Sequence, residues 1–331
     1  MSQSVWSGMP VNTVIHDPVL AHEVAAWFDV QAGMTVVDGT FGAGGHAGML
    51  AEIMHGRGAY VAIDRDPSVE PRARAFRAAH PDMAVRLIKR DFVDAFRSLA
   101  VENVQADAIL LDLGISSMQI DQPDRGFSYA IDAPLDMRMD TRGETTAADL
   151  LATLSERDLA DIFSRYGEER YARQISRAIC RRRCERPYER SADLVDTIRR
   201  AIPIPAQFGS GHPAKRVFQA LRISVNDELK MVEDGLDAAL KILKPGGRIA
   251  VISFHSLEDR IVKDCFRRGS APCICPPDLP ICGCGRKATL RVLTPRVIRP
   301  GSAEIDRNPR STSSRLRVAE RTDAPLPETA G

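Results

Sequence analysis

An acidic residue and a glycine-rich segment in the first part of the chain could together bind a nucleoside. Asp64 follows the apolar run 59–63 and lies about 20 residues beyond the glycines, where an acid on a second strand can bond a ribose hydroxyl. The glycine-rich segment, residues 39–46, has the pattern G-x-x-G-x-G-G-H. Glycine lets the backbone approach a ligand closely. The two features predict a nucleoside-binding α/β unit.

The glycine pattern favours S-adenosylmethionine over a dinucleotide. A dinucleotide fingerprint is G-x-G-x-x-G, and it places a pyrophosphate at a helix N-terminus. In this chain Asp38 directly precedes the glycines, and its charge would repel a pyrophosphate but suit the amino group of an amino-acid moiety. S-adenosylmethionine carries ribose, adenine and an ammonium group without phosphate. An NAD-dependent dehydrogenase is the weaker alternative, and a glycine-rich turn without a ligand is weaker still.

Asp112 is the candidate catalytic residue. It lies at the end of another apolar run, and ligands of open α/β sheets bind outside the carboxyl ends of the strands. In amino-group methyltransferases this position begins a short D/N/S-P-P-aromatic motif, whose first residue accepts a hydrogen bond from the target amine. Asp112 matches that first position, whereas the prolines and the aromatic residue are missing. An acid that only caps the following turn is the alternative.

A helical segment rich in arginine predicts a polyanionic partner. Residues 170–186 hold seven arginines and a single acid, and Arg173, Arg177 and Arg181 recur at helical spacing. Like charges on one helix face destabilise each other, and arginine suits phosphates and exposed bases. Contact with RNA or DNA is therefore favoured over a solvated helix whose charge is balanced by neighbouring acids.

Two other groups of reactive residues carry weaker predictions. Ser253, His255 and Asp259 are close in sequence, whereas a catalytic triad converges from separated positions, and the chain has no G-x-S-x-G elbow. A pair of C-x-C motifs comprises Cys273, Cys275, Cys282 and Cys284. These thiols could bind zinc, but the usual spacing is C-x-x-C, and a single intervening residue strains a shared tetrahedron. We therefore expect thiols without a metal.

Composition and length exclude some classes of protein. With 331 residues, 44% of them hydrophobic, the chain can bury a full core and is long enough for two domains. It has no apolar run long enough to cross a membrane, and residues 1–10 lack the features of a signal peptide. The odd number of cysteines, seven, points to a reducing compartment. We expect a cytoplasmic protein with no membrane partner.

The elements that must position these residues alternate between strands and helices. Apolar runs predict strands at 35–38, 59–63, 84–88, 108–113 and 249–253. Helical patterns fall at 19–30, 46–55, 69–79, 93–100 and 217–243. The alternation stops in residues 121–211, where a loop-like stretch precedes helical patterns from 147 to 202. We predict an α/β sheet domain formed by 1–120 and 212–331, interrupted by an all-helical insertion at 121–211 that recognises RNA.

The motifs of the chain, in their order, resemble those of the bacterial RsmH (MraW) family. They are HDPVL at 16–20, DGTFG at 38–42, GGH at 44–46, AIDRD at 62–66, LDLGISS at 111–117, RGFS at 125–128, PLDMRM at 134–139, YGEER at 166–170, FQALR at 218–222 and SFHSLEDR at 253–260. The resemblance covers roughly residues 12–322. It implies a Rossmann-like class I S-adenosylmethionine-dependent methyltransferase sheet. It also implies methylation of the N4 amine of a cytidine in the decoding centre of 16S ribosomal RNA.

The resemblance further implies which residues contact the methyl donor. These are Gly44, Gly45 and His46 at the methionine end, Asp64 at the ribose, Phe92 near the adenine, Asp112 and Gln119. Phe127 and Tyr129 are candidates to stack on the target base, with burial in their own loop as the alternative. The expected partner is 16S rRNA in the small ribosomal subunit, and monomer and homodimer both stay open. A non-catalytic RNA-binding assembly factor, or a methyltransferase acting on another nucleic acid, is the alternative function.

Overall fold

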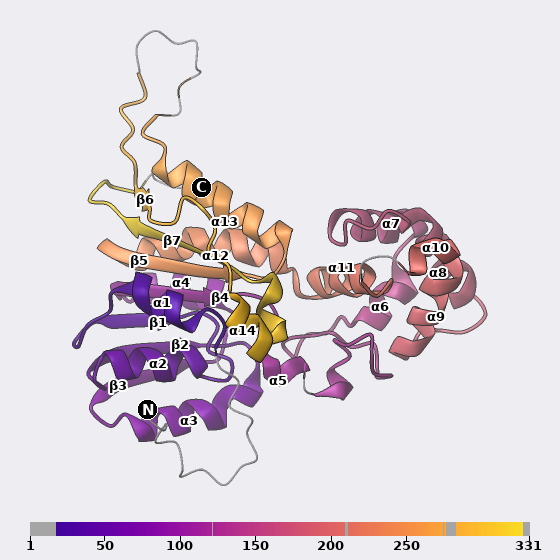
Figure 1. Ribbon diagram of the computed structural model, residues 1–331, viewed down its shortest axis with the longest axis horizontal. Helices are drawn as coiled ribbons and strands as arrows, with labels where there is room; N and C mark the ends of the chain where they lie inside the picture. Colours follow the sequence, from indigo (N-terminus) through magenta and orange to yellow (C-terminus); the bar gives the residue numbers. More distant parts are fainter. Residues whose placement is uncertain (1–17, 121, 209–210, 274, 276–282, 327–331) are drawn as a thin grey trace.

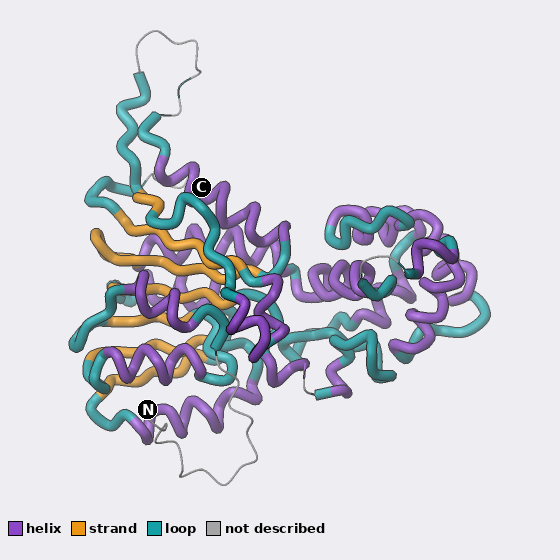
Figure 2. Tube along the Cα trace, in the orientation of Figure 1, coloured by secondary structure: helices purple, strands orange, loops and turns teal. Residues whose placement is uncertain are grey.

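A computed structural model describes residues 18–120, 122–208, 211–273, 275 and 283–326. A seven-stranded sheet with helices packed on both faces forms one part of the molecule, and a group of short helices lies beside it (Figure 1). Strands and helices occupy separate layers in the first part, whereas the second consists of helices and loops (Figure 2). No helix in the described ranges is long and apolar enough to cross a membrane.

The strands are β1 (Thr35–Asp38), β2 (Gly58–Ile63), β3 (Met83–Ile88), β4 (Ala106–Asp112), β5 (Leu243–Ser253), β6 (Leu290–Val292) and β7 (Arg315–Arg321). The helices around the sheet are α1 (Ala21–Phe28), α2 (Gly45–Ile53), α3 (Glu70–Ala79), α4 (Phe92–Val101), α5 (Ser117–Ile120), α12 (Glu228–Ile242), α13 (Ser256–Ser270) and α14 (Ser302–Arg307). The separate group contains α6 (Ala147–Thr153), α7 (Glu156–Arg165), α8 (Ala172–Arg183), α9 (Ser191–Ala201), α10 (Ile204–Gln207) and α11 (Lys215–Asn226).

The strand order creates a ligand-binding edge beside β1. The order is β3-β2-β1-β4-β5-β7-β6, in which the first five are parallel and β7 runs antiparallel to both β5 and β6. After β3 the chain crosses back over β1 to form β4, so the connections on the two sides of β1 diverge. Such a switch point opens a crevice at the carboxyl ends of the strands. This edge holds the ends of β1, β2 and β4, and therefore Asp112.

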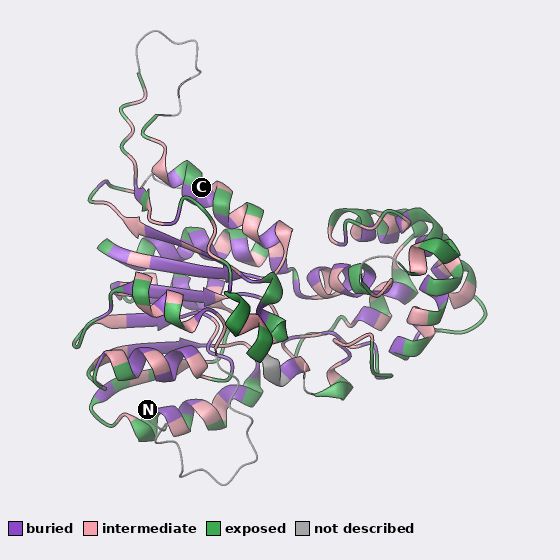
Figure 3. Ribbon diagram, viewed as in Figure 1, coloured by how far each residue is buried: buried purple, intermediate pink, exposed green. Residues whose placement is uncertain are grey.

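Each face of the sheet buries its own apolar cluster. Because successive strand side chains point to opposite faces, Val36 of β1 packs with α1 and α2, whereas Val37 packs with α4 and α12. In β4, Ile109 and Leu110 divide between the two clusters in the same way. The central strands are almost entirely buried (Figure 3). Burial on both faces explains why these segments are apolar runs without alternation.

The helical group has a third, separate core. Its buried residues lie four positions apart, on one face of each helix, as Leu159 and Phe163 do in α7 and Ile175 and Ile179 do in α8. Val217 and Leu221 of α11 belong to the same cluster, so this core extends past residue 211. We therefore propose a division into a sheet domain and a helical insertion. The first part of α11 packs with the insertion.

Two sequence expectations differ from the structure. The helical pattern at 217–243 is two helices, because Asp227 between α11 and α12 has a left-handed backbone with φ of 49°. The pattern cannot show this break, since apolar residues keep helical spacing on both sides of it. The structure also contains β7, for which no strand was predicted, with buried Leu316 and Val318 alternating with arginines. Those arginines interrupt the continuous apolar run by which the other strands were predicted.

Candidate active site

A cavity of about 670 Å³ opens at the carboxyl ends of β1, β2 and β4. Its walls come from the glycine-rich segment, the residues after β4, the helices α11 and α12, and residues 308–313. The sheet and the helical group therefore both contribute to it. Its volume falls within the roughly 300–1,000 Å³ that is typical of small-ligand sites.

The cavity brings together most of the residues predicted to contact the donor. Its lining includes Gly45, His46, Asp64, Phe92, Asp112, Gln119 and Tyr129. The lining does not include Gly44, Phe127, Arg173, Arg177 or Arg181. Gly44 instead precedes α2 with φ of 81°, a conformation that favours glycine, and so shapes the segment next to the cavity.

Asp38 does not have the role that the sequence suggested. Its side chain is buried, with 1% of its surface exposed, and it is not part of the cavity wall. The Tyr60 hydroxyl and the Thr40 backbone N–H donate to its two oxygens at 2.9 and 3.0 Å. Burial raises the pKa of Asp38 to about 6. The carboxylate therefore organises the start of the glycine-rich segment and does not face the ammonium group of a ligand.

Asp64 joins the end of β2 to the glycine-rich segment. Its Oδ2 accepts the Gly42 backbone N–H at 2.8 Å, and its Oδ1 accepts the Asp66 N–H at 2.8 Å. Burial raises the pKa of Asp64. A carboxylate offers about four acceptor positions, so two remain for ligand hydroxyls. The predicted ribose-binding residue thus also holds the glycine-rich segment in place.

His46 and Asp112 face each other across the floor of the cavity. His46 Nε2 lies 2.9 Å from the Val19 carbonyl oxygen, so this nitrogen must carry the proton and donate. Burial lowers the pKa of His46 to about 4, which leaves the ring neutral. Nδ1 then presents a lone pair, and it lies 3.6 Å from Asp112 Oδ2. Two lone pairs meet here unless a proton or a ligand donor lies between them.

Asp112 has a strongly raised pKa in the cavity. Burial, with added repulsion from Asp38 and Glu258, raises its pKa to about 8. Its Oδ1 is enclosed and has no hydrogen-bond partner within the described part of the chain. The backbone of Asp112 is fixed, since its N–H donates to Thr40 Oγ1 at 2.6 Å. An enclosed acceptor with no partner, at a ligand cavity, is suited to a cation or an N–H group from a ligand.

Gln119 bonds protein groups in this structure. Its Nε2 donates to Asp66 Oδ2 at 2.9 Å, and its Oε1 accepts the Ser116 N–H. Arg125 Nη1 donates to the same Asp66 oxygen at 2.9 Å. Asp66 therefore ties α5 and the start of the insertion to β2. Gln119 was predicted as a site residue, whereas no role was predicted for Asp66, although the motif at 62–66 contains it.

The helical side of the cavity adds a buried ion pair that the sequence analysis did not identify. Arg222 donates two bonds of 2.8 Å to Glu228, and their side chains are 13% and 5% exposed. The break at Asp227 lets these residues, from consecutive helices, meet. Lys215, at the start of α11, lies on the same wall and is exposed. The FQALR motif at 218–222 was the available signal for Arg222, but it indicated no role.

The residues around Ser253 form a helix start and not a nucleophile. His255 is the N-cap of α13, and it forms a reciprocal capping box with Glu258. Glu258 Oε2 also accepts the Phe254 N–H at 2.8 Å. These contacts give His255 and Glu258 a structural role that needs no hydrolase.

The two candidate aromatic residues have different surroundings. Tyr129 lines the cavity, and its ring stacks on His212 with centroids 4.6 Å apart and meets Phe218 edge-on. Phe127 packs against the core of the helical group, with the Arg125 guanidinium 5.8 Å from its ring. Tyr129 therefore remains the candidate for base stacking. For Phe127 the structure favours the alternative, burial in its own loop.

The arginines of α8 divide into two sets. Arg182 pairs with Asp193 at 2.7 Å and lies over the Tyr188 ring, and Arg183 donates to carbonyls at the end of α6. These two therefore hold helices together. Solvent-exposed side chains occur at Arg173, Arg177 and Arg181. Arg177 Nε lies 3.4 Å from the exposed Glu156, a contact that contributes little stability.

Comparisons with known proteins agree with this geometry. The family model described as the MraW methylase family matches residues 13–322. A protein of Geobacter sulfurreducens named ribosomal RNA small subunit methyltransferase H is 48% identical over 310 residues, covering 93% of this chain and 99% of that protein. The protein of the same name from Heliobacterium modesticaldum is 45% identical over 308 residues, covering 92% and 98%.

Proposed function

The chain belongs to the MraW methylase family, and we propose that it methylates the N4 amine of a cytidine in the decoding centre of 16S ribosomal RNA. The resemblance noted in the sequence is confirmed over nearly the whole chain. The protein is a methyltransferase, and its methyl donor is S-adenosylmethionine. The names of its relatives support small-subunit ribosomal RNA as the substrate. The choice of cytidine N4 rests on the family resemblance of the motifs. Since ribosomal RNA is the proposed substrate, we propose the cytoplasm as the place of action.

The residues of the cavity fit the methyl donor. Asp64 has acceptor positions for the ribose hydroxyls, and Phe92 offers an apolar face for the adenine. The neutral His46 Nδ1 and the unpartnered Asp112 Oδ1 are acceptors suited to the positively charged methionine end. The enclosed, unpartnered Asp112 oxygen carries this proposal, because nothing in the described fold satisfies it.

Asp112 would activate the target amine. The lone pair of a cytidine N4 is delocalised into the ring, so the amine is a weak nucleophile. A carboxylate that accepts the N4–H bonds favours a pyramidal nitrogen with a localised lone pair. The donor supplies a methyl group already activated by positive sulfur, so positioning and charge stabilisation would provide most of the acceleration. A bound, positively charged donor would favour the ionised form of Asp112, whose pKa burial raises to about 8, and this carboxylate would then take the N4 proton.

The helical side would hold the RNA. The target base must leave its stack to reach the cavity, and Tyr129 lies on the wall where an extruded base could stack. The exposed arginines of α8 would contact phosphates, which position the RNA. Lys215 adds a further positive charge at the cavity wall.

A single assay tests this function. The full chain is incubated with methyl-labelled donor and with small ribosomal subunits from a strain lacking the endogenous enzyme, and the labelled nucleoside is mapped. We expect label on one cytidine N4, and none with Asp112→Asn. Label on another base or in another nucleic acid would contradict the proposed site. Tight RNA binding without any methyl transfer would favour the assembly-factor alternative.

A further inference from the structure

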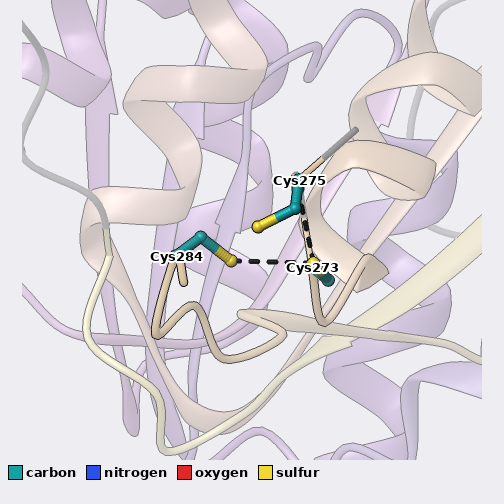
Figure 4. A group of neighbouring side chains, drawn as sticks. All are labelled: Cys273, Cys275 and Cys284. Carbon is teal, nitrogen blue, oxygen red and sulfur yellow. Dashed lines mark hydrogen bonds between the residues drawn. The ribbon is translucent and has the colours of Figure 1, made fainter. Parts of the chain in front are cut away.

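Three cysteine sulfurs converge in the segment between α13 and β6. The Sγ atoms of Cys273, Cys275 and Cys284 all lie within 4.8 Å of one another, and those of Cys273 and Cys284 are 3.7 Å apart (Figure 4). Sulfur ligands at about 2.3 Å from a tetrahedral zinc ion are about 3.8 Å from each other. We propose that these three cysteines bind a zinc ion as thiolates.

The local backbone removes the objection raised by the C-x-C spacing. The Cys275 backbone N–H donates to Cys273 Sγ at 3.3 Å, and the sulfurs of both residues lie close together despite the short spacing. A backbone N–H aimed at sulfur also stabilises the thiolate, the form that binds metal. Cys284 lies farther along the chain, and its sulfur faces the other two (Figure 4). The site is therefore assembled across the loop.

The surroundings suit a metal ion. The segment is basic, with Arg267 and Arg268 in the last turn of α13 and with Arg286 and Lys287 after Cys284. Arg286 Nη2 donates to the Arg268 carbonyl at 2.5 Å, which brings the two sides of the loop together. Arg267 also pairs with Asp264 at 3.0 Å, and the segment still carries net positive charge. Soft sulfur ligands in a tetrahedral arrangement select zinc over magnesium or calcium.

The three cysteines leave one position of a zinc tetrahedron for another ligand. Cys282, the fourth cysteine of the two motifs, lies outside the described residues. The number of sulfur neighbours of the zinc ion, measured by X-ray absorption, shows whether the fourth ligand is a sulfur. The ion would close the loop from Cys273 to Cys284. It would thereby fix the chain that leads into β6, where the Thr289 N–H donates to the Gly269 carbonyl.

The other group with metal-ligand spacing does not support a site. Glu228, His255 and Glu258 have ligand atoms within 4.8 Å of one another and are buried. However, both carboxylate oxygens of Glu228 are bonded to Arg222, and Glu258 is engaged in the capping box. A cation would have to displace the Arg222 guanidinium.

Zinc content of the full-length protein tests the proposal. Wild type, the variant Cys273→Ser/Cys275→Ser/Cys284→Ser and the control Cys180→Ser/Cys184→Ser are purified under reducing conditions, supplied with zinc and desalted. The control cysteines lie on α8. We expect about one zinc per chain in wild type and control, and at least about tenfold less in the triple variant. Wild-type zinc no higher than that of the triple variant would overturn the proposal.

X-ray absorption of the wild-type zinc protein provides a test that does not depend on a variant folding. Three or four sulfur neighbours at about 2.3 Å support the site, whereas a shell of only oxygen and nitrogen overturns it. Trypsin gives a further readout at Arg286 and Lys287. We expect chelation to speed cleavage there at least about threefold in wild type and to have no effect on the triple variant. Equal effects of chelation on both proteins would contradict a metal bound by these cysteines.

Discussion

Replacing Asp112 by asparagine should stabilise the donor-free protein while abolishing its activity. The folded protein raises the pKa of Asp112 from 3.8 to about 8, chiefly by burial and then through Asp38 and Glu258. The folded state therefore binds a proton that the unfolded chain releases. The stability contributed by this proton is complete below pH 3.8 and is lost as the pH rises towards 8. Asparagine has no charge to bury, so the variant avoids this loss.

The size of the effect follows from the difference between the two pKa values. Each unit corresponds to about 1.4 kcal/mol, so keeping Asp112 costs the folded state about 3 kcal/mol at pH 6 and about 5 kcal/mol at pH 8. These are upper values, because 26% of the side chain is exposed. We therefore expect the stability gained by Asp112→Asn to increase by about 1–2 kcal/mol between pH 6 and pH 8.

Denaturant unfolding of both proteins at pH 6 and pH 8, without donor, measures this difference. The pKa of Asp38 is raised to about 6 and that of His46 is lowered to about 4, but both groups are present in both proteins. The exposed Asp94→Asn serves as the control, and its effect should be equal at the two pH values. Turnover of Asp112→Asn should fall at least about hundredfold at saturating donor. A stability gain independent of pH would refute the electrostatic argument, and normal turnover would assign amine activation to another residue.

Three further predictions concern the donor, the adenine wall and the RNA. Asp64→Ala should lower donor affinity at least about tenfold by isothermal titration, since it removes the ribose acceptor and releases the Gly42 N–H; unchanged affinity would exclude this assignment. Gly235→Ala would place Cβ 2.2 Å from the Phe92 ring. We expect this variant to lose about 1–3 kcal/mol of stability and to bind the donor more weakly. Normal stability together with normal donor affinity would mean that Phe92 moves freely. The slope of log RNA affinity against log salt should flatten by about 0.7 for each lost phosphate contact when glutamine replaces Arg173, Arg177 and Arg181. The donor affinity of this triple variant should stay unchanged. The charge-matched control replaces Arg74, Arg97 and Arg267 with glutamine. Equal salt slopes in the two triple variants would show that the α8 arginines are only solvated.

The sequence alone was sufficient for features that depend on neighbouring residues in the chain. Buried parallel strands appear as short apolar runs, because both faces are covered, and the acid that follows such a run lies at the ligand-binding edge. Asp64 and Asp112 could be singled out on this basis. The ordered motifs then indicated the family. The same local information suggested a role for Asp38, but the Tyr60 hydroxyl from the neighbouring strand turns that carboxylate into a buried structural group.

Only the tertiary structure decided how residues distant in sequence are paired. Arg181 and Arg182 are adjacent and equally basic, yet Asp193 and the Tyr188 ring occupy Arg182 while Arg181 stays exposed. Arg317 of β7 pairs with Asp259 of α13, which is 58 residues away in the sequence. The fold also places the Cys284 sulfur beside those of Cys273 and Cys275, a convergence that the C-x-C spacing did not indicate. Spacing along the chain determines which face of an element a side chain occupies, whereas its partner depends on which other element packs against that face.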